Sequence, residues 1–323
     1  MIAPEGVAGT TALTAGSDPF VHEALFYADA EEYLAGTVPF ICTALAAGEP
    51  VLMAAPQPGL DLVGSALGTD AGSVRFVDMT VAGRNPGRII PEVLDAFARQ
   101  HAGRRVSVIG EPIWPGRSTA QYRAALQHES LINAAFAGRA ATILCPYDAT
   151  GLHPAALADA EQTHPVLVQR GFRRASPLYV DPAELRPRFD LPLPEPPPAT
   201  PALAFDGTGL RSVREFVREH AGRAGLPPTR IVDLLLAVNE AATNTVSHTT
   251  AGAGTVRVWP TDGGVVCEMS DGGHIGQLLA GRLPPGPDSQ RGRGLLIINH
   301  LCDLVEIQSA EGGTTIRMHV SQR

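Results

Sequence analysis

The chain has no lysine, and all 25 of its basic residues are arginine. A phosphate-binding loop of the Walker A type requires lysine, so this motif is excluded. The formal net charge is −8, and no basic patch or basic helix stands out along the sequence. These features argue against direct binding of nucleic acid.

Cysteine is scarce, and long apolar runs are missing. Cys42, Cys145, Cys267 and Cys302 stand far apart without a C-x-x-C pair, which predicts buried thiols in a reducing cytoplasm. No run approaches the ~18–20 consecutive apolar residues of a membrane span, so we expect a cytoplasmic protein without membrane association. Residues 1–18 lack the basic start of a signal peptide and are predicted to be a disordered leader.

What the sequence does contain is enough material for two globular domains. The chain has 323 residues, of which 44% are hydrophobic and 18% charged, so each half can bury its own core. Prolines crowd residues 187–201, which favours an extended polyproline spacer. A partner could read its P-x-x-P spacing, but we favour a stiff linker. We place the first domain at 19–185, the linker at 186–202 and the second domain at 203–323.

The first half alternates short apolar runs with amphipathic stretches. We predict strands at residues 24–27, 50–55, 73–77, 105–110 and 140–145. We predict helices at residues 31–47, 60–67, 89–101, 119–137 and 153–161. Continuous apolar strands between such helices indicate an α/β domain with a mostly parallel sheet covered on both faces.

Chemically versatile residues in this half follow the predicted strands, where sheets of this kind bind ligands. They lie in Gly110-Glu-Pro-Ile-Trp-Pro-Gly-Arg-Ser118, in Cys145-Pro-Tyr-Asp148, in Thr163-His-Pro165 and near the start at His22. The candidate ligand-sensing residues are His22, Glu111, Trp114, Arg117, Cys145, Tyr147, Asp148 and His164.

Together with Glu49 and Asn85-Pro86, these segments resemble the MEDS sensory domain over about residues 19–180. That family occurs in regulators thought to sense hydrocarbon-type small molecules. The resemblance implies a RecA-like fold without a phosphate-binding loop, and a small, largely apolar ligand.

Simpler interpretations of several residues stay open. Trp114 would then plug a loop against the core, and Arg117 would form a surface ion pair of little energetic value. The atom types of His22, Cys145 and His164 suit zinc, but no sequence spacing supports a metal site, and we favour buried core residues. His128 and Glu129 are adjacent on a predicted helix, so we expect only one of them to face inward.

The helix predicted at residues 229–248, with Thr229 as its N-cap, carries the strongest signal in the second half. One stripe is apolar: Ile231, Leu234, Leu235, Val238, Ala242 and Val246. Glu240, Asn244 and His248 follow one another at four-residue steps, so they share another edge of the helix. A solvated polar face is the simpler alternative.

Three glycine-bearing segments follow this helix: Val265-Val-Cys-Glu-Met-Ser-Asp-Gly-Gly273, Arg291-Gly-Arg-Gly294 with an apolar helix after it, and Gly312-Gly-Thr-Thr315. In this order they resemble the GHKL (Bergerat-type) ATP-binding domain, and within it the anti-sigma-factor serine kinases. The resemblance covers about residues 203–323. It implies a Bergerat-type α/β sandwich, which we expect to have a mixed sheet with helices on one face.

The resemblance also implies a role for each matching residue, with ATP and Mg²⁺ as cofactors. Glu240 would be the general base and Asn244 the Mg²⁺ ligand. Asp271 and Gly273 would receive adenine. The phosphates would meet Gly292 and Gly294 at a helix N-terminus and either Arg291 or Arg293, while Thr314 and Thr315 would place hydroxyls beneath the nucleotide.

One position departs from the family pattern Asp-x-Gly-x-Gly: Ile275 stands where the last glycine is expected. The segment after it, residues 274–290, is the predicted lid. The proline linker occupies the place of a phosphoacceptor-histidine hairpin, so autophosphorylation on histidine is not expected.

We therefore predict a cytoplasmic signalling regulator that couples small-molecule sensing to a serine/threonine-kinase-type anti-sigma domain. Its partners would be a sigma factor and a STAS-type antagonist, and a homodimer is the oligomer we consider. One alternative is an ATP-dependent binding switch without phosphotransfer. The other is a metabolic enzyme acting on the sensed ligand, which would need a nucleophile–base pair that the first half does not offer.

Overall fold

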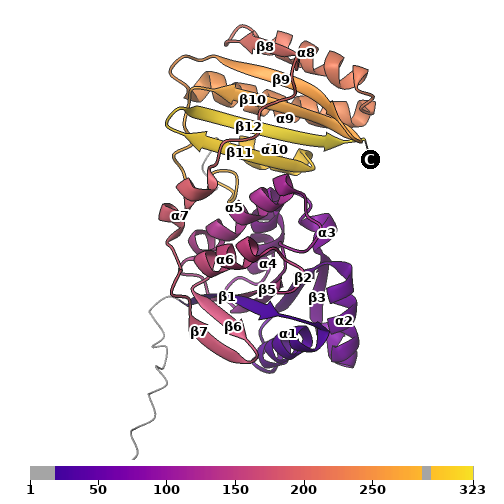
Figure 1. Ribbon diagram of the computed structural model, residues 1–323, viewed down its shortest axis with the longest axis vertical. Helices are drawn as coiled ribbons and strands as arrows, with labels where there is room; N and C mark the ends of the chain where they lie inside the picture. The colour runs from indigo at the N-terminus through magenta and orange to yellow at the C-terminus, as the bar shows by residue number, and fades with distance from the viewer. Residues whose placement is uncertain (1–18, 286–291, 323) are drawn as a thin grey trace, which may run out of the picture.

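The computed structural model describes residues 19–285 and 292–322, so the leader predicted for residues 1–18 lies outside it. Two sheets, of seven and five strands, form the centres of two units. The units lie one above the other along the longest axis, with the C-terminal unit at the top of Figure 1. No helix within the described ranges is long and apolar enough to cross a membrane.

The first unit is built on a mostly parallel sheet, as predicted. Its strand order is β3-β2-β4-β5-β1-β6-β7, and only β7 runs antiparallel to its neighbour. The terminal hairpin of β6 and β7 had no sequence prediction. The strands are β1 (Phe20–Tyr27), β2 (Val51–Ala55), β3 (Val74–Asp78), β4 (Val106–Gly110), β5 (Ala141–Asp148), β6 (Val166–Gln169) and β7 (Phe172–Ala175).

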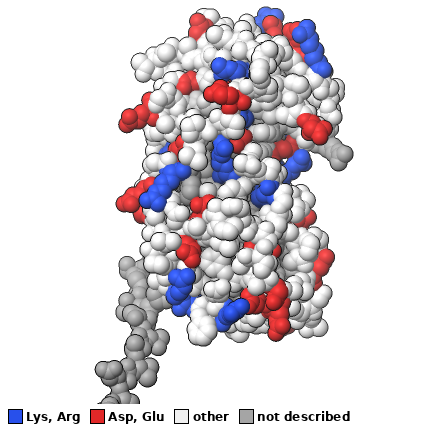
Figure 2. All heavy atoms as spheres, in the orientation of Figure 1, with Lys and Arg blue, Asp and Glu red and all other residues white. Residues whose placement is uncertain are grey.

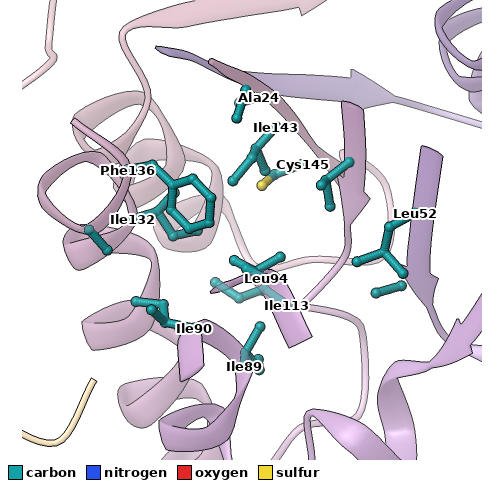
Figure 3. Packing of buried hydrophobic residues seen from close by; sticks show 14 of the residues in the cluster. Ala24, Leu52, Ile89, Ile90, Leu94, Ile113, Ile132, Phe136, Ile143 and Cys145 are labelled. Atoms are coloured by element: carbon teal, nitrogen blue, oxygen red, sulfur yellow. The ribbon is translucent and has the colours of Figure 1, made fainter. Parts of the chain in front are cut away.

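Helices cover both faces of this sheet. They are α1 (Ala30–Ala46), α2 (Gln57–Leu67), α3 (Met79–Ala82), α4 (Asp95–Gln100), α5 (Thr119–Phe136) and α6 (Pro154–Thr163), with the short elements η1 (Gly68–Ser73), η2 (Pro86–Arg88) and η3 (Ile89–Leu94). Successive residues of β1 alternate between the two apolar cores, Ala24 and Phe26 on one side and Leu25 on the other. Phe136 and Ile132 of α5 point toward the strands that carry Ile143 and Cys145 (Figure 3).

The helix predicted at residues 89–101 is divided. Residues Ile89–Leu94 form a π-helical turn, and the regular helix α4 follows it. Pro91 lies inside the widened turn. Because proline lacks a backbone N–H and its ring collides with the preceding turn, a regular helix is disfavoured there.

The linker starts as a helix and not as the extended spacer that its prolines predict. Helix α7 (Pro182–Phe189) contains Pro187, and the extended chain begins only after it. In so short a helix, proline removes a single hydrogen bond. The extended part crosses the outer face of the second sheet, where Arg317 donates to the carbonyl oxygen of Pro194 at 2.7 Å.

The second unit has an antiparallel sheet with helices on one face (Figure 1). The mixed sheet that we expected is therefore wrong, although the layered α/β class is confirmed. Its strands, in the order β11-β12-β10-β9-β8, are β8 (Ala202–Phe205), β9 (Gly254–Thr261), β10 (Gly264–Asp271), β11 (Leu304–Ala310) and β12 (Gly313–Ser321). Its helices are α8 (Leu210–Arg223), α9 (Pro228–His248) and α10 (Gly294–Leu301).

Helix α9 begins one residue before the predicted cap. Pro227 is the N-cap and no side chain caps the helix, so the role assigned to Thr229 is wrong. Proline at the first helical position needs no capping partner because it has no N–H. The predicted apolar stripe packs in the core, with Leu234, Val238 and Ala242 buried.

The two units meet where η2 contacts the end of α10. Asn85 Nδ2 and Arg88 Nε donate to the carbonyl oxygen of Asn299 at 2.9 and 2.8 Å, and Arg88 Nη2 donates to that of Cys302 at 2.8 Å. The last carbonyl groups of a helix have no partner within the helix. Residues of the first unit therefore supply hydrogen bonds that α10 cannot make by itself.

A segment of the predicted lid lies in the same junction. Leu278, Leu279 and Leu283 pack against the core of the first unit. The guanidinium group of Arg282 is buried and donates to the carbonyl oxygen of Pro86 at 3.2 Å. Burial lowers the pKa of Arg282 to about 10.

Basic and acidic side chains are interspersed on the face of the molecule shown in Figure 2.

This junction corrects one prediction about α5. His128 and Glu129 are both buried, at 1% and 0% exposure. Burial lowers the pKa of His128, and the nearby charges of Arg282 and Arg117 lower it further. Glu129 lies near His22 and His164 of the first unit. Two adjacent helical residues are buried together because the second unit covers the face of α5 that would otherwise meet solvent.

Replacing Gly87 by alanine should loosen the contact between the units. A methyl group at Gly87 would overlap the side chain of Asn299, at a cost of roughly 1–3 kcal/mol. We expect faster hydrogen exchange at residues 298–303 and faster proteolysis within residues 190–201. Gly72→Ala is the matched control, because nothing lies near its added methyl group. Unchanged exchange in Gly87→Ala would contradict this account of the junction.

Candidate functional site

The polar edge of α9 faces the start of α10. A Cβ atom built on Gly294 would lie 2.9 Å from Asn244 Nδ2 and 3.2 Å from Glu240 Oε2. Both side chains are half-buried. The structure therefore places Glu240, Asn244 and Gly294 close together, while His248 lies exposed at the end of the helix.

Asp271 closes the next side of this site, at the end of β10. Its carboxylate accepts hydrogen bonds from Thr245 Oγ1 at 2.6 Å and from the backbone N–H of Gly273 at 2.8 Å. A Cβ atom on Gly273 would lie 2.8 Å from Thr249, so glycine is required for this close approach. Sequence analysis missed Thr245, although its position directly after Asn244 was available as a signal.

The two threonines of the last glycine segment separate. Thr314 Oγ1 donates to the carbonyl oxygen of Gly273 at 2.9 Å, which ties β12 to the loop after Asp271. Thr315 pairs with Ser270 in register and lies on the opposite face of the sheet. Side chains alternate between the faces of a strand, so these two hydroxyls cannot both lie beneath one ligand. The structure therefore does not place Thr315 with the other predicted residues.

The residues before α10 complete the site. Gly292 has a φ of +94°, a conformation that favours glycine. Arg293 is exposed and forms the N-cap of α10. Arg291, which we also expected at the phosphates, lies outside the described residues.

In the first unit, three of the predicted sensing residues gather with Glu129. His22 Nε2 lies 3.4 Å from Cys145 Sγ, and His164 Nε2 lies 3.2 Å from Glu129 Oε2. Tyr147 is buried beside them, with its ring centroid 5.5 Å from that of His164. Sequence analysis missed Glu129 as a member because it expected only one inward-facing residue on that turn of α5.

The other predicted residues lie in separate surroundings. The guanidinium group of Arg117 stacks on Trp114, 3.7 Å from the ring centroid, and donates to the carbonyl oxygen of Gly83 at 2.9 Å. Burial lowers the pKa of Arg117 to about 9. The carboxylate of Asp148 accepts from the N–H groups of Thr150 and Gly151 and thereby shapes a turn.

Comparison with family profiles agrees with this division. Residues 21–165 match MEDS, the methanogen/methylotroph DcmR sensory domain, and residues 203–320 match the histidine kinase-like ATPase domain. The chain thus joins a MEDS domain to a histidine kinase-like ATPase domain.

The solved structures similar to parts of this chain include two that each have a TM-score of 0.29. The RsbU and RsbW domains of a Mycobacterium tuberculosis protein are 24% identical over 38% of this chain, and this chain covers 32% of that one, about a third of its length. The SiaB–SiaC complex from Pseudomonas aeruginosa is 15% identical over 36% of this chain and 88% of that one. No curated protein matches.

Glu111 is a buried carboxyl group of the MEDS domain with a shifted pKa. Tyr33 and Tyr27 donate to its two oxygens at 3.1 and 3.3 Å. Burial raises the pKa of Glu111 to about 7, although these two hydrogen bonds lower it. The position of Tyr27 at the end of a predicted strand was a sequence signal for its place beside Glu111. Tyr33 offered no such signal, because it lies on helix α1.

Replacing Glu111 by glutamine should flatten the pH dependence of stability. The folded pKa of about 7 lies above the ordinary 4.5, so the unfolded chain ionises first as pH rises. The stability contributed by this group is complete below pH ~4.5 and is lost toward pH ~7, by roughly 2–3 kcal/mol.

Urea unfolding at several pH values measures this effect. The difference between parent and Glu111→Gln should change between pH 5 and 7, whereas replacing exposed Glu311 by glutamine should leave the profile as it is. A parent profile that rises through this interval relative to Glu111→Gln would overturn the assignment.

Proposed function

We propose that this protein is a signalling regulator in which a MEDS sensory domain controls an ATP-dependent, serine-kinase-type anti-sigma domain. The sensory domain would comprise residues 19–185, the linker 186–202 and the kinase-type domain 203–323. One observation carries the proposal: the helix whose N-terminus meets Glu240 and Asn244 has its C-terminus bound by the sensory domain.

The residues around Gly294 suit a nucleotide with its metal ion. Within the described chain, neither Glu240 nor Asn244 makes a side-chain hydrogen bond that would occupy it, and Gly294 leaves room where any other residue would press on both. Asn244 would hold Mg²⁺ through its amide oxygen. Asp271 would hold the adenine amino group, while the N–H groups at the start of α10 would receive phosphate.

Glu240 would act as the general base. It lies beside the N-terminus of α10, so its carboxylate can accept the proton of a hydroxyl group that approaches the phosphates. ATP supplies the phosphoryl group when bound. We propose a serine of a STAS-type antagonist as the hydroxyl donor, and a sigma factor as the partner that the domain binds otherwise.

The sensory domain would act through two contacts. Asn85 and Arg88 bind the carbonyl groups at the end of α10, and a rigid helix of eight residues transmits a shift of that end to Gly294. Ile275, at the position where the family has glycine, is the second contact: Arg186 donates to its carbonyl oxygen, and its own N–H donates to Ser309. Ile275, the residue that replaces the last glycine of the family pattern, thus lies where α7 meets the predicted lid.

The sensed molecule would be small and largely apolar. The MEDS core is packed with aliphatic and aromatic side chains. Glu111, whose pKa is raised to about 7, is neutral in about half of the molecules near that pH. A neutral carboxyl group can donate a hydrogen bond to a hydroxyl or carbonyl group of such a ligand.

Two substitutions on α9 test the kinase assignment. Glu240→Ala should leave nucleotide affinity nearly unchanged and lower phosphotransfer by about 10²–10⁴-fold, because a base acts only as the hydroxyl attacks. Asn244→Ala should lower both Mg²⁺-dependent ATP binding and turnover. Neither opens a core cavity, so unfolding free energies should stay within roughly 0.5–1 kcal/mol of the parent.

Calorimetric titration with ATP·Mg²⁺ and transfer to the antagonist measure the two effects. Thr243→Ala is the control, since Thr243 is exposed on the same helix. Tight ATP·Mg²⁺ binding by Asn244→Ala would refute the site. Weak binding by that variant, with no transfer by the parent to any serine substrate, would favour the alternative of an ATP-dependent binding switch.

A further inference from the structure

We propose that His22, Glu129, Cys145 and His164 form a binding site for a divalent transition-metal ion, with Zn²⁺ as the best match. The four side chains come from β1, α5, β5 and the residue that ends α6. One donor atom of each lies within 4.8 Å of the others, and all four residues are buried. This site lies in the MEDS domain and is separate from the proposed nucleotide site around Gly294.

The hydrogen bonds of the two histidines leave their Nε2 atoms as electron-pair donors. His164 Nδ1 lies 2.9 Å from the carbonyl oxygen of Ala160, which can only accept, so Nδ1 carries the proton. Asn133 Nδ2 donates to the carbonyl oxygen of Thr163 at 2.8 Å, which turns Asn133 Oδ1 toward His22 Nδ1 at 3.2 Å. Both rings therefore hold the tautomer that metal-bound histidines adopt.

These electron pairs converge on a carboxylate without a hydrogen-bond partner. Both oxygens of Glu129 and His164 Nε2 are buried, and none of these three atoms has a hydrogen-bond partner among the described residues. His164 Nε2 lies 3.2 Å and His22 Nε2 lies 3.7 Å from Glu129 Oε2. A buried carboxylate facing two lone pairs is unfavourable unless a positive charge lies between them.

The distances between donor atoms agree with a tetrahedron around one ion. Bonds of ~2.0–2.3 Å to zinc give tetrahedron edges of about 3.3–3.8 Å. The observed separations are 3.2 Å for His164 Nε2 to Glu129 Oε2, 3.4 Å for His22 Nε2 to Cys145 Sγ and 3.7 Å for His22 Nε2 to Glu129 Oε2.

The donor set selects the kind of metal. Two imidazole nitrogens, a thiolate and a carboxylate suit Zn²⁺, whereas Mg²⁺ and Ca²⁺ prefer oxygen donors alone. Four protein donors in a fully buried site leave no open position for water or substrate, which is typical of a structural site. Binding would release the thiol proton of Cys145, so the ion would neutralise two of the negative charges that the site presents.

Such an ion would fix α5 to the sheet. Glu129 lies on the face of α5 toward β1 and β5, and its neighbour His128 lies toward Arg282 of the kinase-type domain. Metal binding and release would therefore act on the helix that separates the sensory core from the junction.

Metal content and Co²⁺ spectroscopy of the full-length, untagged protein test the proposal. We expect one zinc ion per chain and, after exchange with Co²⁺, the absorption bands of a tetrahedral site with a thiolate-to-cobalt charge-transfer band. Cys145→Ser should lose the charge-transfer band. Cys267→Ser is the matched control, since Cys267 is a buried thiol in the other unit and its replacement should leave the band in place.

A second variant keeps the test independent of folding defects in Cys145→Ser. Glu129→Gln preserves the shape of the side chain, and its Co²⁺ affinity should fall at least about 10-fold. Parent protein that is isolated without zinc and takes up no Co²⁺ would overturn the proposal, because a shared proton would then supply the positive charge. Retention of the charge-transfer band in Cys145→Ser would overturn it as well.

Discussion

The carbonyl groups at the C-terminus of α10 are the constraint on which the arrangement of the two domains depends. They are buried in the junction, and Asn85 and Arg88 of the MEDS domain supply their hydrogen bonds. A buried carbonyl group without a partner is costly, so the ATPase domain is not complete without its neighbour at this point. The other end of the same helix meets Glu240 and Asn244. One short helix thus connects Asn85 and Arg88 of the MEDS domain with Glu240 and Asn244 of the ATPase domain.

In the MEDS domain, helix α5 lies between the buried core and the junction with the ATPase domain. On one face of this helix, Glu129 lies near His22 and His164. On another face, His128 lies near Arg282. Close-packed interiors respond to a change at one face by displacing the whole element. In the proposed mechanism, a ligand or metal ion in the MEDS core biases the packing of the lid segment through α5, without a contact of its own to the ATPase domain.

The MEDS interior holds more polar groups than folding by itself requires. Glu111 and Arg117 have pKa values shifted by burial, and His128 and Tyr147 each have a buried polar atom without a hydrogen bond in the described structure. Such groups lower stability, and they concentrate at functional sites. Two of them, Glu111 and Tyr147, lie at the carboxyl ends of β4 and β5, where a parallel sheet binds its ligands.

The sequence by itself determined the two α/β layers and the apolar stripe of α9, because local periodicity specifies these features. The expectation that Glu240 and Gly294 share one site came from the resemblance to the GHKL family, since the two residues lie far apart in the chain. It did not determine which of Thr314 and Thr315 shares a face of the sheet with Asp271, since that requires the register of β12 against β10. Only the tertiary structure decided that His128 and Glu129 are both buried and that His22, Glu129, Cys145 and His164 converge. Residues this far apart in the chain meet only after the sheet and the second domain have covered both faces of α5.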